Sequence, residues 1–227
     1  DLRMSATNNE RFRHAITRPH GMLLATGPTG SGKSTTLYTA LREVANPRIN
    51  VITVEDPVEY RMPGVNQVQV NQKAGLTFSS ALRSILRSDP DVLLVGEIRD
   101  METAVISIEA ALTGHLVLST LHTNDAPSAL TRLTEIGAEP FLVATALSAV
   151  IGQRLARRLC TRCRAAYVES PEILESLRFP HDPADPPTIY KAVGCASCSN
   201  TGYRGRVAVH EIMTVTEEVE QLVVRRA

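Results

Sequence analysis

Tryptophan is absent from the 227-residue sequence and other aromatic residues are few, so a buried core must be built mainly from leucine, valine, isoleucine and alanine. Charge of one sign is not in excess either, because 24 lysines and arginines balance 24 aspartates and glutamates. This balance argues against bulk electrostatic binding to nucleic acid or to an acidic membrane surface. No apolar run approaches the ~20 residues of a membrane-spanning helix, and no signal-peptide pattern is visible. The sequence opens on Asp1 rather than methionine, which suggests a fragment of a longer protein.

A glycine-rich loop is the most informative stretch. It follows an apolar run at residues 22–26 and precedes a helical pattern, which is the context that the phosphate-binding motif G-x-x-x-x-G-K-[ST] requires. Glycines let successive backbone N–H groups point toward phosphate oxygens, and the following helix adds partial positive charge. Lys33 can reach the β- and γ-phosphates of ATP, and the Ser34 hydroxyl can ligate Mg²⁺. The expected nucleotide-binding residues are Gly27, Pro28, Thr29, Gly30, Ser31, Gly32, Lys33, Ser34 and Thr35.

Short apolar runs alternate with helical patterns through the first two thirds of the chain. Four buried strands and one half-exposed strand are predicted, at residues 22–26, 50–54, 91–95, 116–120 and 65–70. The apolar spacing also predicts a helix over residues 141–150, and a strand and a helix close the sequence at residues 206–213 and 217–226. Strands that alternate with helices are typical of an α/β fold with a mostly parallel, helix-flanked sheet.

Ionisable side chains follow three of the predicted buried strands. Glu55 and Glu59 come after the second strand, Glu97 after the third and His122 after the fourth. Ligands of parallel sheets bind at the carboxyl ends of strands, so these side chains should gather near the phosphate loop. Phosphoryl transfer needs carboxylates near Mg²⁺ and the attacking water, and we expect Glu97 to act with Glu59 or Glu55, and His122 to contact the γ-phosphate. His115 precedes the fourth strand, roughly 20 Å from His122, which favours a structural or interfacial role.

The four cysteines form two C-x-x-C pairs. Each pair can place two thiolates on one tetrahedral Zn²⁺, and four such ligands leave no open position for substrate, which indicates a structural site. The alternative is two disulfides or redox-active pairs, which the reducing cytosol disfavours. Arginines crowd around the first pair, on a surface that is either solvated or an interface between subunits. The expected zinc ligands are Cys160, Cys163, Cys195 and Cys198.

The combination of motifs resembles that of the bacterial secretion and type IV pilus assembly ATPases, and most closely the type II secretion ATPases. The matching segments are the Walker A loop, the Asp box, the Walker B segment, the His box and a glycine-arginine turn, at residues 27–38, 52–60, 82–100, 113–125 and 202–206, together with the four cysteines. The resemblance implies a RecA-like P-loop core. We expect this ATPase core at residues 1–152, a zinc-binding tetracysteine subdomain at 153–206, and a C-terminal strand and helix that pack on the core at 207–227.

The resemblance also implies ATP and Mg²⁺ as cofactors, a ring hexamer, and mechanical work that drives pseudopilus assembly on the cytoplasmic face of the inner membrane. It places Glu55, Glu59, Glu97, His115 and His122 in the active-site region. Members of the family carry N-terminal domains that supply arginines to the nucleotide and dock on inner-membrane secretion-platform proteins. These domains are absent from the sequence, so we expect the chain to bind ATP but to hydrolyse it poorly by itself.

Two other functions are compatible with parts of the sequence. A type IV pilus assembly ATPase shares the cysteine motif, although the continuation of the loop through Tyr38 and the strand at residues 209–213 favour type II secretion. A nucleic-acid-translocating motor could share the RecA-like core. The zero net charge and the scarcity of aromatic side chains argue against stacking on single strands, and no nucleic-acid partner is expected.

Overall fold

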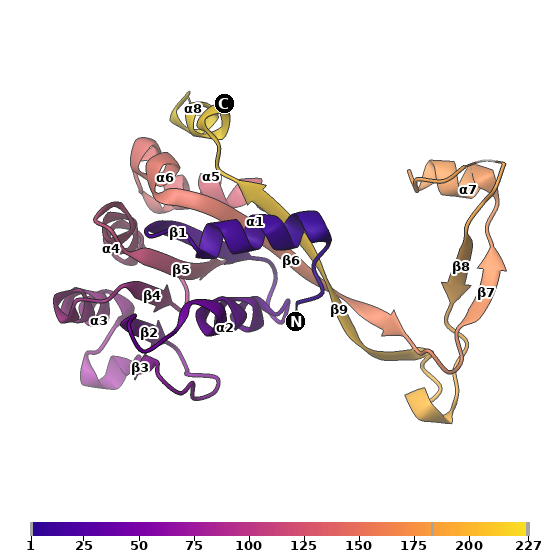
Figure 1. Ribbon diagram of the computed structural model, residues 1–227, viewed down its shortest axis with the longest axis horizontal. Helices are drawn as coiled ribbons and strands as arrows, with labels where there is room; N and C mark the ends of the chain where they lie inside the picture. Colours follow the sequence, from indigo (N-terminus) through magenta and orange to yellow (C-terminus); the bar gives the residue numbers. More distant parts are fainter. Residues whose placement is uncertain (1, 183, 226–227) are drawn as a thin grey trace. The chain divides into compact units, whose positions relative to one another are not determined.

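The computed structural model describes residues 2–182 and 184–225 (Figure 1). The chain divides into two compact units. Unit 1 comprises the chain up to Arg154 together with the segment that begins at Ala208, and unit 2 comprises Leu155–Val207. Both ends of the sequence therefore contribute to unit 1, and unit 2 is an insertion in it.

Unit 1 is built on a seven-stranded sheet, counted over the described residues. Its order is β3-β2-β4-β5-β1-β6-β9, and every neighbouring pair from β3 to β6 is parallel. The strands are β1 (Gly21–Thr26), β2 (Val51–Glu55), β3 (Asn66–Gln69), β4 (Val92–Val95), β5 (Leu116–Leu121), β6 (Leu147–Leu159) and β9 (Tyr203–Thr214). The predicted α/β fold with a mostly parallel sheet is confirmed.

Helices cover both faces of this sheet, as Figure 1 shows. Alternate residues of β1 point to opposite faces, so Met22 and Leu24 join one core cluster while Leu23 and Ala25 join the other. The helices α1 (Ala6–Ile16) and α2 (Lys33–Val44) contribute to the second cluster. The first cluster draws on α3 (Phe78–Ile85), α4 (Met101–Leu112), α5 (Pro127–Ile136), α6 (Pro140–Ala146) and α8 (Glu217–Arg225). The core is aliphatic, as the composition requires, and Tyr38 and Phe12 are its two large aromatic members.

Unit 2 is small and has little core of its own. It contains the antiparallel pair β7 (Ala165–Val168) and β8 (Thr188–Lys191), the short helix α7 (Pro171–Ser176) and the 3-10 turn η3 (Ala196–Cys198). Two further 3-10 turns, η1 (Gln72–Ala74) and η2 (Leu86–Ser88), belong to unit 1. None of the helices in the described ranges combines the length and apolarity needed to cross a bilayer.

The helix predicted over residues 141–150 is wrong in its second half. Helix α6 ends at Ala146, and β6 begins at Leu147, which pairs with Met22 of β1. A continuous apolar run is compatible with both a buried helix and a buried strand, and here parallel pairing with β1 decides for the strand. The helix predicted at residues 217–226 is α8, which is described to Arg225, and Arg226 lies outside the described residues.

Candidate active site and metal centre

The phosphate loop connects β1 to α2, as predicted, and its shape depends on glycine. Gly27, Gly30 and Gly32 have φ values of 143°, 76° and 91°, which L side chains rarely adopt. At Gly27 a side chain would also collide with the backbone, because a Cβ atom there would lie 2.2 Å from the carbonyl oxygen of Gln153. The loop is therefore closely packed on β6 at its first glycine, while nothing lies within 4 Å of a Cβ at Gly30.

Lys33 is the first residue of α2, and its amine is folded back into the loop. The Nζ atom donates hydrogen bonds to the carbonyl oxygens of Gly27 at 2.8 Å and Pro28 at 3.2 Å. Burial lowers the pKa of Lys33, and the nearby Glu97 carboxylate partly opposes this shift. The ammonium is thus held among backbone carbonyls beside one carboxylate, where phosphate oxygens would be strong competing acceptors. Ser34 and Thr35 follow it and are exposed.

Glu97 lies just beyond β4 and is the centre of a small group of charged side chains. Its Oε1 lies 2.7 Å from a guanidinium nitrogen of Arg99, and its Oε2 lies 3.4 Å from Nε2 of His122, which follows β5. The Glu97 side chain is 14% exposed, whereas the Arg99 side chain is largely exposed and that of His122 is about half exposed. Glu97, His122 and Lys33 are therefore gathered at one edge of the sheet, at the ends of adjacent strands.

Glu55 ends β2 and is only 4% exposed. One of its carboxylate oxygens accepts a hydrogen bond from the hydroxyl of Tyr38, and the other accepts hydrogen bonds from Thr53 at 2.6 Å and Gln67 at 3.2 Å. Burial and the hydrogen bond to Glu55 raise the pKa of Tyr38 above its ordinary value. Glu59, a few residues later, is exposed. Of the three candidate glutamates, Glu55 is thus already engaged by side chains, while Glu59 is open to solvent.

His115 lies at the opposite end of β5 from His122. Its Nδ1 is 2.9 Å from the carbonyl oxygen of Ala110, at the end of α4. It therefore contacts the helix that precedes β5, and within the described chain its ring is not among the groups that surround Lys33 or Glu97.

Several polar residues near the loop were not found from the sequence. Gln153 of β6 hydrogen-bonds both Ser31 and Thr36, and the Thr26 hydroxyl accepts from the backbone N–H of Thr123 at 2.9 Å. The carboxylate of Glu211, from β9, accepts from the backbone N–H of Ala126 at 2.9 Å, in the loop that follows His122. Their partners lie far away in the sequence, so no local motif marks them. The one available signal was that Gln153 interrupts an apolar strand.

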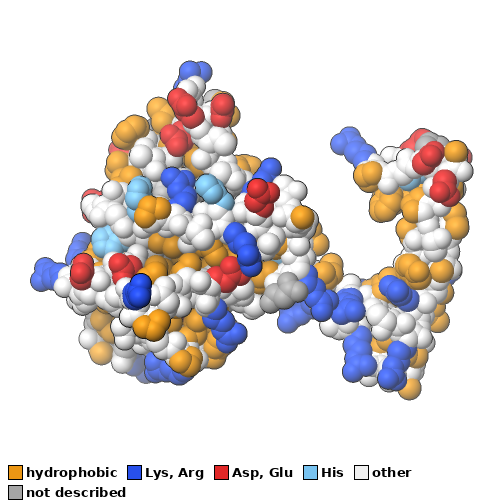
Figure 2. All heavy atoms as spheres, in the orientation of Figure 1, with side chains coloured by type: hydrophobic (Ala, Val, Ile, Leu, Met, Phe, Trp, Pro, Cys, Tyr) orange, Lys and Arg blue, Asp and Glu red, His pale blue; other side chains and the backbone are white. Residues whose placement is uncertain are grey.

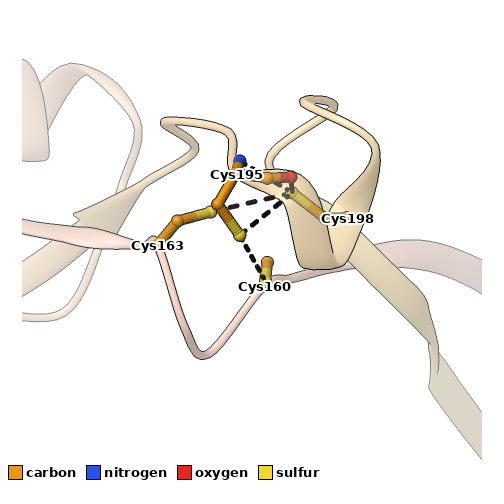
Figure 3. Close-up of side chains that lie close together, drawn as sticks. All are labelled: Cys160, Cys163, Cys195 and Cys198. Atoms are coloured by element: carbon orange, nitrogen blue, oxygen red, sulfur yellow. Dashed lines mark hydrogen bonds between the residues drawn. The ribbon is translucent and has the colours of Figure 1, made fainter.

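The four cysteines lie together in unit 2, as Figure 3 shows. They are free thiols, and their sulfur atoms all lie within 4.8 Å of one another. The sulfur atoms are separated by 4.0 Å between Cys160 and Cys195 and by 3.8 Å between Cys198 and both Cys163 and Cys195. Sulfurs bound to one tetrahedral zinc at about 2.3 Å would be separated by about 3.8 Å. Three of the six separations therefore lie close to the tetrahedral value, and none exceeds 4.8 Å.

Backbone groups also prepare the cluster for thiolates. The N–H groups of Cys195 and Gly202 donate to the Cys198 sulfur at 3.2 and 3.3 Å, and that of Gly194 donates to Cys163 at 3.3 Å. Burial by itself would raise the pKa of Cys198, but the N–H groups of Cys195 and Gly202 and the neighbouring Cys195 and Cys163 side chains lower it to about 6, whereas burial raises the pKa of Cys163 to about 11. A thiolate is the form of cysteine that binds a metal. The four cysteines could therefore hold one metal ion.

The surface around the cysteines is strongly basic. Residues 155–168 and 188–207 contain seven lysines and arginines and no acidic residue. Figure 2 shows Lys and Arg side chains, in blue, gathered on the visible face of unit 2. Two of the guanidinium groups stack on tyrosine rings, Arg157 on Tyr203 at 4.0 Å and Arg164 on Tyr190 at 4.2 Å from the ring centroid. These contacts hold the two side chains in defined positions.

Comparisons with known proteins give a consistent result. The model of the family described as Type II/IV secretion system protein matches residues 1–227. The type IV pilus assembly ATPase PilB of Thermus thermophilus is 53% identical over 95% of the chain, and the type II secretion system ATPase E of Vibrio cholerae is 50% identical over 98%. The chain spans only 24% and 44% of these two relatives.

Solved structures agree with the sequence relatives. The pilus retraction motor PilT with bound ADP has a TM-score of 0.71 and 29% identity, and the match covers 99% of this chain and 55% of PilT. The ATPase DotB of Legionella pneumophila has a TM-score of 0.66 and 25% identity, covering 99% of this chain and 52% of DotB.

Proposed function

The chain belongs to the type II/IV secretion system protein family, and from this premise we propose that it binds ATP with Mg²⁺ and hydrolyses it as part of a motor for type II protein secretion. The observation that carries the proposal is the buried Lys33 amine, which lies inside a glycine-shaped loop and beside Glu97. A buried ammonium among carbonyl oxygens, at the N-terminus of a helix, is suited to receive phosphate oxygens.

The surroundings of each side chain suggest a division of roles. We assign the backbone of residues 27–33 and Lys33 to the phosphates, and the Ser34 hydroxyl to Mg²⁺. Glu97 is the best placed carboxylate to act on the metal shell or on the attacking water, because it adjoins both Lys33 and His122. His122 then contacts the γ-phosphate side of the site, and the exposed Glu59 serves as the second carboxylate. Glu55, whose oxygens accept three hydrogen bonds, supports α2 through Tyr38.

Pilus assembly is the second candidate for the work that ATP drives. Relatives with both names are about equally similar, so their identities do not favour either. Tyr38 and the strand at residues 209–213 favour type II secretion. For either process we propose a homohexamer on the cytoplasmic face of the inner membrane, which meets the secretion platform through domains outside this chain. Translocation of nucleic acid has no observation in its favour beyond the basic surface of unit 2.

For the cysteines we propose one structural Zn²⁺ bound by Cys160, Cys163, Cys195 and Cys198. The support is the fit of their sulfur separations to a tetrahedral zinc. Four thiolate ligands close the coordination sphere, so this metal would stabilise unit 2 and take no part in hydrolysis.

The proposed activity is tested by measuring Mg²⁺-dependent binding and hydrolysis of ATP by wild type and Lys33→Ala across a range of protein concentrations. We expect wild type to bind nucleotide and the variant to lose most of that affinity. Specific activity that rises with concentration would indicate that subunits complete one another's sites. If wild type binds no nucleotide, or if Lys33→Ala binds equally well, the proposal is wrong.

A further inference from the structure

The side chain of Gln153 bridges the glycine-rich loop and the first turn of α2. It is 3% exposed and extends from β6, which pairs with the strand that leads into the loop. Its Oε1 accepts a hydrogen bond from the hydroxyl of Thr36 at 2.6 Å, and its Nε2 donates to the carbonyl oxygen of Ser31 at 2.7 Å. Ser31 and Thr36 are themselves buried. The bridge is therefore shielded from water, where hydrogen bonds are strongest.

The chemistry of the two partners fixes the orientation of the amide. The carbonyl oxygen of Ser31 can only accept a hydrogen bond, so the group of Gln153 that faces it must be the NH₂ group. The oxygen of the amide is then left for Thr36, whose hydroxyl donates. The Ser31 carbonyl thus selects the orientation of the amide, and Thr36 holds the amide there by donating to its oxygen.

This bridge also fixes the direction of a backbone donor. In a planar trans peptide the C=O of one residue and the N–H of the next point in opposite directions. Because the Ser31 carbonyl oxygen accepts a hydrogen bond from Gln153 of β6, the N–H of Gly32 points away from the Gln153 amide. Gly32 is held at φ 91°, and the next residue is Lys33. At the proposed phosphate site, the direction of this N–H is therefore set before any ligand arrives.

We propose that Gln153 is a positioning residue for nucleotide binding, which presents the Gly32 N–H to the phosphates and is itself held in place by Thr36. The inference rests on the proposed function of the loop. A buried glutamine that only stabilised the core would make the same hydrogen bonds. The two roles differ in one respect: only a positioning role changes nucleotide affinity when folding is intact.

The test compares the affinity of the chain for a fluorescent ADP with Mg²⁺ across matched variants. Gln153→Glu keeps the shape and the acceptor for Thr36 but has no donor for Ser31. Thr36→Val removes the hydroxyl that holds the amide in place, whereas Thr36→Ser keeps a hydroxyl at this position. Ser107→Ala is the control, because it removes another buried hydrogen bond, at 2.7 Å to the Thr103 carbonyl in α4, away from the loop. Thermal unfolding of each variant without nucleotide is recorded in parallel.

We expect Gln153→Glu to weaken ADP binding by about tenfold or more, because the Gly32 N–H is no longer held toward the phosphates and one hydrogen bond to the charged ligand is lost. Thr36→Val should weaken it by a smaller factor, Thr36→Ser should bind like wild type, and Ser107→Ala should lose only stability. The proposal is overturned if Gln153→Glu and Thr36→Val bind ADP as wild type does. It is also overturned if neither variant unfolds cooperatively, because Gln153 would then be required for folding itself. Failure of wild type to bind ADP, or full binding by Lys33→Ala, would instead refute the proposed function.

Discussion

Removal of the metal proposed at the four cysteines should unfold unit 2 and leave unit 1 folded. Within the described part of unit 2, the buried apolar side chains are those of Leu174 and the two cysteines Cys160 and Cys198. One buried leucine contributes about 1.5–3 kcal/mol, whereas a structural zinc in a small domain contributes about 10–16 kcal/mol. The metal therefore dominates the stability of this unit. Unit 1 has an extensive aliphatic core on both faces of its sheet and needs no metal.

Hydrogen exchange of the reduced protein, before and after chelation of zinc, measures this difference directly. We expect the amides paired between β7 and β8 to lose their protection when the metal is removed, while those paired between β1 and β5 keep theirs. Added Zn²⁺ should restore the protection. Cys198→Ser should behave like the chelated protein, and Ser197→Ala, which leaves all four thiols in place, should behave like wild type.

Two results would refute the reasoning. One is a chelated, reduced protein in which β7 and β8 remain as protected as before, since unit 2 would then be stable without a metal. The other is metal analysis of freshly purified, reduced protein that finds far less than one zinc per chain. Protection that disappears only on reduction would point instead to disulfides.

Two further predictions concern unit 1. Tyr38→Phe leaves the buried Glu55 without one hydrogen bond and should cost about 1.5–3 kcal/mol at neutral pH. Burial and Glu55 raise the pKa of Tyr38, so above about pH 10 the unfolded chain releases a proton that the folded protein retains. The free energy of unfolding of wild type should therefore fall with rising pH by up to about 1.4 kcal/mol per pH unit more than that of Tyr38→Phe. Urea unfolding of both proteins at several pH values measures this difference. Asp100 is the N-cap of α4, and its carboxylate accepts a hydrogen bond from the Thr103 N–H at 2.8 Å. Asp100→Ala should lower the free energy of unfolding by about 1 kcal/mol, whereas Asp100→Asn, which keeps an acceptor, should lower it little. Equal stabilities of the two variants in thermal unfolding would contradict this assignment.

The sequence predicted those parts of the site that are local. A strand, a glycine-rich loop and a helix are consecutive, so the motif and its context could be read together. Glu97 and His122 were also predictable, because parallel strands bring their carboxyl ends to one edge whatever their order in the sheet. The cysteine cluster followed from two short spacings and the chemistry of thiolates.

Contacts between segments that lie far apart in the sequence could not be predicted in the same way. The run after Ala146 is apolar enough for a helix or a strand, and its pairing with β1 made it a strand. The roles of the three glutamates could not be separated from the sequence, because each follows a strand or its turn. Their difference comes from Tyr38 and Gln67, which occupy the oxygens of Glu55, while Glu97 has Lys33 beside it.

The groups that hold the site in place come from segments that follow the loop far along the chain. In space β1 lies between β5 and β6, so the loop that follows β1 has neighbours from both. The β5 side offers Thr123, which bonds Thr26, and the β6 side offers Gln153, which bonds Ser31 and Thr36. A ligand-binding loop can be recognised by its own residues, but its rigidity depends on the strands beside it. In a parallel sheet those strands are separated from the loop by whole helices, so the supports of a site are encoded far from the motif that they serve.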